Sequence, residues 1–310
     1  MLDMKEIVVF LVGPTAVGKS EAAVELALAI NAEIISCDSM QVYQGMDIGT
    51  AKPGKDIRKR IPHHLIDIIK PKVEFSCADF CQRSKVLIAG IIKNGKIPLL
   101  VGGSGLYIKT LVDGLFSGPS RDQKLRNRLT RQAELYGNQY LYQKLKQLDP
   151  VSAVKIHPND RRRIIRSLEV YEKVKIPISR LKPLKEGISS QYKVRIIGLD
   201  RDRKDLYNRI DQRVDKMLEH NLVDEVRGLI KKGLSLTAQQ ALGYKEVIGY
   251  LNGRYGLKEA ERLVKRNTRH FAKRQLSWFR HEKRIEWVKI DKNETAGRTA
   301  EKVLKLLSES

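Results

Sequence analysis

The stretch Gly13-Pro14-Thr15-Ala16-Val17-Gly18-Lys19-Ser20 matches the phosphate-binding pattern G-x-x-x-x-G-K-S in full. It follows the apolar run from Ile7 to Val12 and precedes a helix-like run from Glu21 to Ile30. In such a loop, several backbone N–H groups and the start of the helix bind one anion. Lys19 adds a charge for an outer phosphate, and Ser20 adds a hydroxyl for Mg²⁺. The stretch therefore predicts a phosphorylated ligand.

Strand and helix signals alternate through the first third of the chain. Two further apolar runs, Glu33 to Ser36 and Lys96 to Val101, suit a parallel sheet covered on both faces. Ligands of such sheets bind beyond the carboxyl ends of the strands. The phosphate loop, Asp38-Ser39-Met40-Gln41 and Gly102-Gly103-Ser104-Gly105 would therefore meet at one place. We expect an α/β fold with a single site at this edge.

The composition indicates a soluble protein with an anionic partner. The 310 residues suggest about two domains, and 59 Lys and Arg against 36 Asp and Glu give a formal net charge of +23. Such a charge attracts polyanions, above all nucleic acid; the alternative is a basic solvated surface without a specific partner. We see no membrane segment and no signal peptide, and the three cysteines suggest no disulfide framework. We therefore expect a cytoplasmic protein with no membrane partner.

A basic helical module interrupts the alternating pattern. From Gly118 to about Ser190 the sequence predicts helices and no clear strand, and Asn159 to Tyr171 is the most cationic of them. Its apolar positions mark a buried side, which leaves much of the arginine set facing outward. Tyr192 to Asp200 predicts a strand that returns to the sheet, and only helices are expected after it.

Two features leave alternatives open. Near the C-terminus, Val264, Phe271 and Trp278 recur every seven residues, and basic residues line another side of the same helix: Arg262, Arg266, Arg269, Lys273 and Arg280. This pattern is typical of a core-packed helix with a solvated face, or of a rail for a phosphate backbone. The adjacent His63 and His64 could contact a ligand phosphate or could simply pack.

The phosphate loop alone allows several reactions. A GTPase is disfavoured because no N-K-x-D motif is present, and a motor-type ATPase because no apolar strand ends in paired acidic residues. A small-molecule or nucleotide kinase remains, with Asp38 as the base on a hydroxyl. A nucleic-acid-binding NTPase without transfer chemistry also remains.

Six segments narrow this choice: Gly13 to Ser20, Asp38 to Tyr43, Gly45 to Pro53, Leu100 to Tyr107, His157 to Asp160 and Ala241 to Tyr244. In order and spacing they resemble the IPP transferase family, the bacterial tRNA dimethylallyltransferases that prenylate N6 of the adenosine 3′ of the anticodon, position 37. The resemblance implies a P-loop NTPase-like parallel sheet flanked by helices, formed by residues 1–118 and 191–310. It also implies an inserted all-helical domain, 119–190, that grips the tRNA anticodon stem-loop. Dimethylallyl diphosphate would be the donor, Mg²⁺ the cofactor, and the protein a monomer.

The resemblance also implies roles for individual residues. Asp38 would accept the amine proton, Lys19 would stabilise the leaving diphosphate, and Thr15 would lie beside the reacting groups. Arg213 would join the phosphate loop in binding diphosphate. Ser104, where the family more often has Thr, keeps the hydroxyl. The residues implied to contact tRNA are Asp38, Ser39, Met40, Gln41, Ser104, Arg126, Arg162, Arg163, Ile164, Ile165, Arg166, Gln240, Ala241, Leu242, Gly243, Tyr244 and Lys245.

Overall fold

The computed structural model describes residues 6–116, 118–119, 121–181 and 183–309. The chain forms two compact units: a core unit of residues 1–113 and 188–310, and a helical unit of residues 114–187. The expected insertion, 119–190, begins and ends later in the chain than this helical unit. Two short strands near the ends of the helical unit pair antiparallel, and the sequence analysis predicts no strand there. None of the helices in the described ranges is both long and apolar enough to span a membrane.

A six-stranded sheet forms the centre of the core unit, in the order β3-β2-β4-β1-β7-β8. All neighbouring strands in it are parallel. The strands are β1 Ile7–Val12, β2 Ala32–Ser36, β3 His63–His64, β4 Ile97–Gly102, β7 Lys193–Arg201 and β8 Ile285–Ile290. The predicted parallel sheet and its returning strand are confirmed. The prediction that only helices follow the returning strand is wrong, because β8 adds an edge strand.

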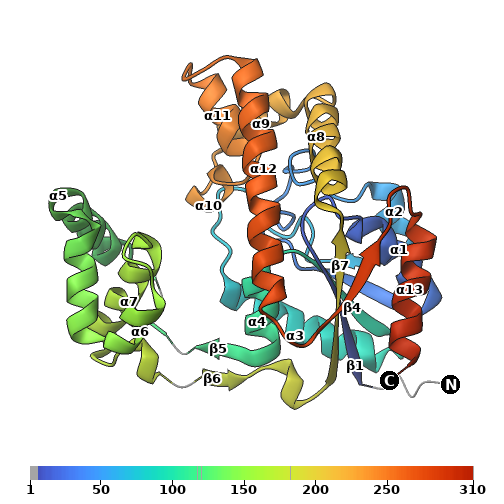
Figure 1. Cartoon of the computed structure of the whole chain (residues 1–310), viewed down its shortest axis with the longest axis horizontal. Coiled ribbons are helices and arrows are strands. Elements are labelled where there is room, and N and C mark those ends of the chain that lie inside the picture. The colour runs from blue at the N-terminus through green and yellow to red at the C-terminus, as the bar shows by residue number, and fades with distance from the viewer. Residues whose placement is uncertain (1–5, 117, 120, 182, 310) are drawn as a thin grey trace. The chain divides into compact units, whose positions relative to one another are not determined.

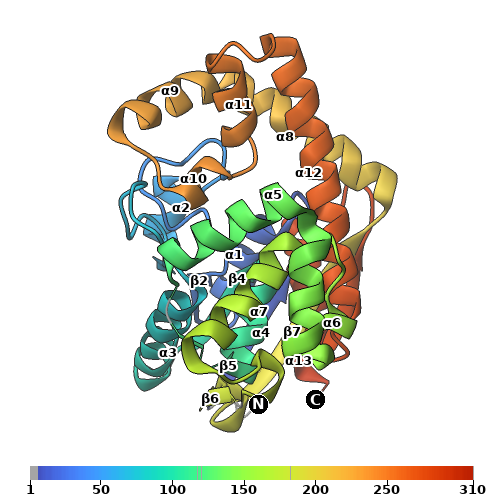
Figure 2. The same cartoon turned by 90° about the vertical axis from the view of Figure 1, so that its left-hand side faces the viewer.

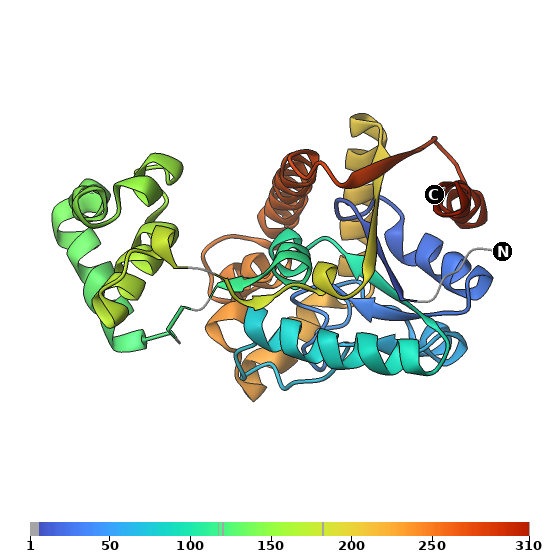
Figure 3. The same ribbon diagram turned by 90° about the horizontal axis from the view of Figure 1, so that it is seen from below.

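Helices cover both faces of this sheet, as its apolar strands require. On one face lie α1 (Lys19–Ala29) and α13 (Ala296–Ser308), packed on side chains such as Val9. On the other lie α3 (Cys77–Lys93) and α4 (Gly105–Asp113), packed on side chains such as Phe10. Figure 3 shows α3 and α13 on opposite sides of the strands. Alternate residues of β1 thus enter two separate cores.

A second group of helices follows β7 beyond the carboxyl edge of the sheet (Figure 1). They are α8 Arg203–Glu219, α9 Leu222–Lys232, α10 Leu236–Gln239, α11 Tyr244–Leu251 and α12 Leu257–Arg280, and α2 (Lys55–Arg60) lies earlier in the chain. Helix α12 is packed through Val264 and Phe279, as the core-packed interpretation expects. Acidic residues of the core unit pair with three of its basic side chains, Arg262, Arg269 and Arg280. Much of the supposed rail is therefore neutralised locally.

The helices of the helical unit, labelled in Figure 2, enclose a small core of their own. Helices α5 (Gln123–Leu148), α6 (Pro150–Lys155) and α7 (Arg161–Val174) bury Leu129, Leu141 and Leu168 between them. Strands β5 (Gly114–Phe116) and β6 (Pro183–Glu186) pair antiparallel at its base. The sequence predicted no strand here, and these two are only three and four residues long.

A buried carboxylate joins the helices of this unit. Glu169 of α7 accepts hydrogen bonds from Arg126 Nε at 3.0 Å and Nη2 at 2.8 Å, from Arg166 Nη1 at 2.8 Å and from the N–H of Asp122 at 2.7 Å. Burial alone would raise the pKa of Glu169, but these bonds lower it to about 2. Glu169 is therefore ionised and ties α7 to the start of α5.

Gly102 allows β4 to end against β2, and its replacement tests this packing. A Cβ on Gly102 would lie 2.4 Å from the Cys37 carbonyl oxygen. We predict that Gly102→Ala lowers the free energy of unfolding by about 1–3 kcal/mol, measured by urea denaturation. In Gly90→Ala, the control on α3, the new Cβ meets no atom within 4 Å. It should raise stability by about 0.5–1 kcal/mol. Equal effects of the two substitutions would contradict the close approach.

Removing the Glu169 carboxylate should loosen the helical unit. Glu169→Ala leaves Arg126 and Arg166 without their shared partner, at a cost of about 3 kcal/mol. We predict faster hydrogen exchange in peptides of α5 and α7 and no change in the sheet, followed by mass spectrometry. Glu172→Ala is the control, because its pair with Arg128 lies at the surface, and it should change stability by less than about 1 kcal/mol.

The stabilisation of the helical unit by the Glu169 carboxylate depends on pH, and its direction follows from the pKa. The folded-state pKa of Glu169 lies near 2, below its usual value of 4.5. Its stabilisation is therefore complete above pH 4.5 and is lost as the pH falls toward 2. The exchange difference between wild type and Glu169→Ala should shrink over this window. A difference that stays constant down to the lower limit would exclude the ion cluster as its cause.

Candidate active site

A cleft of about 690 Å³ opens at the carboxyl edge of the sheet, within the core unit. The ends of β1, β2 and β4 contribute Thr15, Asp38 and Gly103 to its wall. The loop of residues 47–53 and one side of α8 form further walls, and Phe271 and Gln275 of α12 also line the cleft. The three strand ends that the sequence predicted to converge therefore do so in the structure.

The phosphate loop has the backbone shape that its glycines permit. Gly13 has φ +150°, and a Cβ there would lie 2.8 Å from the Leu199 carbonyl oxygen on the neighbouring β7. Gly18 has φ +111° and leads directly into α1, whose first turn receives no side-chain cap from it. The first N–H groups of α1 therefore remain available to an anion at this wall.

Two cations, Lys19 and Arg213, line the cleft. The Lys19 Nζ donates to the carbonyl oxygens of Gly13 at 3.0 Å and Pro14 at 2.7 Å. Arg213 of α8 donates through Nη1 to the Thr15 hydroxyl at 3.2 Å. Within the described ranges neither forms an ion pair. Burial lowers the pKa of Lys19 to about 8 and also lowers that of Arg213, while the nearby Asp38 opposes both shifts. Two desolvated cations side by side favour an anion of more than one charge.

Asp38 lies directly after β2 and lines the same cleft. Its Oδ1 accepts the N–H of Met40 at 2.8 Å, which fixes the carboxylate in a turn. Among the described contacts, Oδ2 receives no hydrogen bond, so it can accept a proton from a ligand. One oxygen of Asp38 therefore holds the turn, and the other can serve as the base that the sequence predicts.

Residues from much later in the chain form hydrogen bonds that hold the loops of this site, and they were not predicted from the sequence. Gln275 of α12 accepts the N–H of Thr15 at 2.9 Å and donates to the Gly103 carbonyl oxygen at 2.9 Å. Arg209 of α8 donates to the Ala16 carbonyl oxygen at 2.9 Å. No local pattern marks either residue, since each acts on a partner more than 170 positions away.

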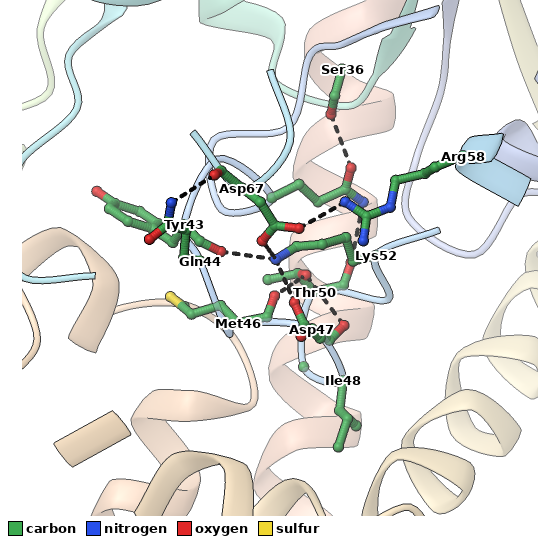
Figure 4. A network of polar contacts seen from close by, with 12 residues as sticks. Ser36, Tyr43, Gln44, Met46, Asp47, Ile48, Thr50, Lys52, Arg58 and Asp67 are labelled. Carbon is green, nitrogen blue, oxygen red and sulfur yellow. Dashed lines mark hydrogen bonds and ion pairs between the residues drawn. The ribbon is translucent and has the colours of Figure 1, made fainter. Parts of the chain in front are cut away.

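A polar network shapes the wall of residues 47–53 (Figure 4). The Lys52 ammonium, almost fully buried, contacts Asp47 Oδ1 and Asp67 Oδ1 at 2.5 Å each and the Tyr43 carbonyl oxygen at 2.8 Å. Arg58 pairs with the other oxygen of Asp67 at 2.8 Å. Lys52 thus links three positions of the segment between β2 and α3, which has little regular secondary structure.

Of the other residues that the sequence analysis singled out near the cleft, some line it and others have structural partners instead. Gln41 lines the cleft, whereas Ser104 closes the turn below it by accepting the N–H of Ser39 at 3.3 Å. His64 pairs with Glu33 at 2.7 Å, so it has a structural partner. His63 lines the cleft and bonds to the Ile61 carbonyl oxygen through Nδ1 at 2.7 Å. The two histidines therefore divide between the packing and the ligand-facing interpretations.

Some residues implied to contact tRNA are buried in their own units. Ile164 and Ile165 lie in the core of the helical unit, and Ala241 and Tyr244 in that of the core unit. Their side chains are not available to a ligand at the surface. The positions at the surface are Arg162, Arg163, Gln240 and Lys245. Arg126 and Arg166 pair with Glu169, whereas Arg162 and Arg163 face outward, as expected for much of the arginine set of this helix.

Comparison with known proteins agrees with this architecture. The family model "IPP transferase" matches residues 41–282, and "Isopentenyl transferase" matches residues 6–63. The tRNA dimethylallyltransferase of Halothermothrix orenii is 50% identical over 91% of this chain and 87% of its own length. That of Alkaliphilus oremlandii is 46% identical over 97% of each.

Solved structures give the same result. The full-length tRNA isopentenylpyrophosphate transferase of Bacillus halodurans aligns with a TM-score of 0.73 and 40% identity, over 98% of this chain and 96% of its own. A eukaryotic dimethylallyltransferase described as acting on tRNA aligns with a TM-score of 0.80 and 28% identity, over 98% and 79%. Since these matches span nearly the whole chain, the protein belongs to the IPP transferase family of tRNA dimethylallyltransferases.

Proposed function

We propose that the protein transfers the dimethylallyl group of dimethylallyl diphosphate to N6 of adenosine 37 in tRNA and releases diphosphate, as a cytoplasmic monomer. The observation that carries this proposal is that Lys19 and Arg213, which form no ion pair among the described residues, share one cleft with Asp38. The first two suit a diphosphate leaving group, and the third suits an amine that must lose a proton.

The geometry supports a displacement at the allylic carbon. The bond from this carbon to the diphosphate oxygen breaks, and its electron pair leaves with the diphosphate. The N6 lone pair forms the new C–N bond, and Asp38 Oδ2 accepts the N6 proton. On binding, the Lys19 ammonium would exchange the carbonyls of Gly13 and Pro14 for phosphate oxygens, and Arg213 would meet the same group. A positioned base contributes about 10²–10⁴-fold to such a step.

The chain also fits a phosphate-bound Mg²⁺. Ser20, the first residue after Lys19, lines the same cleft. Its hydroxyl, the donor phosphates and water would together hold the ion. When bound, Mg²⁺ would add charge stabilisation to the departing diphosphate.

The basic surface supports tRNA as the acceptor. The net charge of +23 suits a phosphate backbone. Arg162 and Arg163 lie exposed at the start of α7, where Arg163 also forms a surface pair with Asp160 at 3.4 Å. We propose that the helical unit uses them on the anticodon stem-loop. The target base must leave its stack, which costs a few kcal/mol and is least costly in a single-stranded loop.

A transfer assay tests the proposal. We predict that the protein, Mg²⁺, dimethylallyl diphosphate and unmodified tRNA yield N6-dimethylallyladenosine, detected by mass spectrometry of the nucleosides. Parallel reactions with γ-labelled ATP should show neither label transfer to a small acceptor nor RNA-stimulated phosphate release. Absence of prenylated adenosine with a competent tRNA, together with either ATP reaction, would replace prenyl transfer by a kinase or an NTPase.

The division between chemistry and binding gives a second test. We predict that Asp38→Asn lowers kcat by about 10²–10⁴-fold, because the amide cannot take the proton. Its Kd for tRNA should stay within twofold, or about 0.4 kcal/mol, of wild type. The double variant Arg162→Ala/Arg163→Ala is the counterpart: it should weaken tRNA binding and lower the salt dependence, with kcat at saturating tRNA unchanged. The same loss of tRNA affinity in both would refute this division.

A further inference from the structure

A carboxylate from α9 binds three successive N–H groups of the cleft wall. Glu225 Oε2 accepts the N–H groups of Asp47 at 3.0 Å and Ile48 at 2.8 Å, and its Oε1 accepts that of Gly49 at 3.2 Å. Bonds to an ionised acceptor are stronger than neutral ones. One side chain thereby satisfies a run of loop donors, about 175 positions away in the sequence.

Tyr244 completes this contact from α11. Its hydroxyl donates to Glu225 Oε1 at 2.5 Å, and its side chain is fully buried. Burial, followed by the nearby Glu225 carboxylate, raises the pKa of Tyr244, so the phenol remains a donor at physiological pH. The ring also packs on Gly49, where a Cβ would lie 2.4 Å from the nearest ring carbon. The loop is therefore held by its N–H groups and by contact with one ring.

The next residue of this loop faces the cations of the cleft. The Thr50 carbonyl oxygen accepts Arg213 Nη2 at 3.5 Å and Gln41 Nε2 at 3.4 Å. Arg213 meanwhile donates to Thr15 of the phosphate loop. The guanidinium thus spans the cleft between the phosphate loop and the loop that Glu225 holds. Displacement of Thr50 would remove one of its two anchors.

We propose that Glu225 and Tyr244 are positioning residues, which set the Arg213 guanidinium for the donor diphosphate by fixing residues 47–50. This inference rests on the proposed function. It assigns Tyr244 a part in donor binding, whereas the family resemblance implies contact with tRNA. The burial of the whole side chain favours the former, since a tRNA at the surface cannot reach the phenol.

The experiment compares Tyr244→Phe with a matched control. Tyr255→Phe removes a hydroxyl in the turn after α11, which donates to the Glu246 carbonyl oxygen at 2.9 Å and does not line the cleft. We expect Tyr244→Phe to raise the Kd for inorganic diphosphate, measured calorimetrically, and the KM for dimethylallyl diphosphate by about tenfold. The Kd for tRNA should not change, and Tyr255→Phe should match wild type in all three.

Other outcomes overturn the inference. Wild-type Kd and KM in Tyr244→Phe would show that the hydroxyl only stabilises the fold, and a weakened tRNA Kd alone would make Tyr244 a tRNA contact. If Tyr244→Phe does not fold, Glu225→Gln provides the same test, because the amide keeps the shape and loses the charge. Failure of the proposed function is distinguishable: wild type itself would then neither bind diphosphate nor transfer the prenyl group.

Discussion

The burial of two cations, Lys19 and Arg213, in one cleft is the constraint on which the site depends. Burial lowers the pKa of both groups, Arg213 lowers that of Lys19 further, and the nearby Asp38 opposes both shifts. Such an arrangement persists only when the surrounding structure holds it. Carbonyl oxygens of the phosphate loop hold Lys19, while Thr15 and Thr50 hold Arg213. An anion with several charges would compensate the two buried cations, so ligand binding offsets an electrostatic cost already present in the fold.

The loops that hold these two cations are themselves held by side chains of the helices that follow β7. Gln275 fixes the phosphate loop against β4, and Glu225 fixes the opposite wall. Both residues belong to helices that follow β7, whereas the loops that they hold lie in the first third of the chain. Because the returning strand β7 lies beside β1, these helices begin next to the phosphate loop. The topology of the sheet therefore determines which late residues can reach the site.

The sequence predicts those parts of the site whose structure depends on residues that are neighbours in the chain. The phosphate loop requires glycines at Gly13 and Gly18 for its backbone angles, so the sequence displays it directly. The buried strands are equally visible, because both faces are apolar. Strand β8 was missed because Glu286 and Lys289 interrupt it at the sheet edge, and β6 because it is short and starts at Pro183. Gln275, Glu225 and the partners of Arg126 could not be predicted, since their roles exist only through contacts distant in sequence.

The number of charged residues is known from the sequence, but which of them face solvent is known only from the structure. Basic motifs in the sequence suggested exposed arginines in α7, yet Arg166 and its neighbour Arg126 serve a buried carboxylate. Pairing of this kind does not change the excess of 23 basic over acidic side chains. Even if every carboxylate neutralised one cation, that many would still face solvent or ligand. The total therefore supports a polyanionic partner, whereas only the structure identifies which arginines are available to it. At the start of α7 these are Arg162 and Arg163, at the surface of a unit whose buried ion cluster holds the helix that carries them.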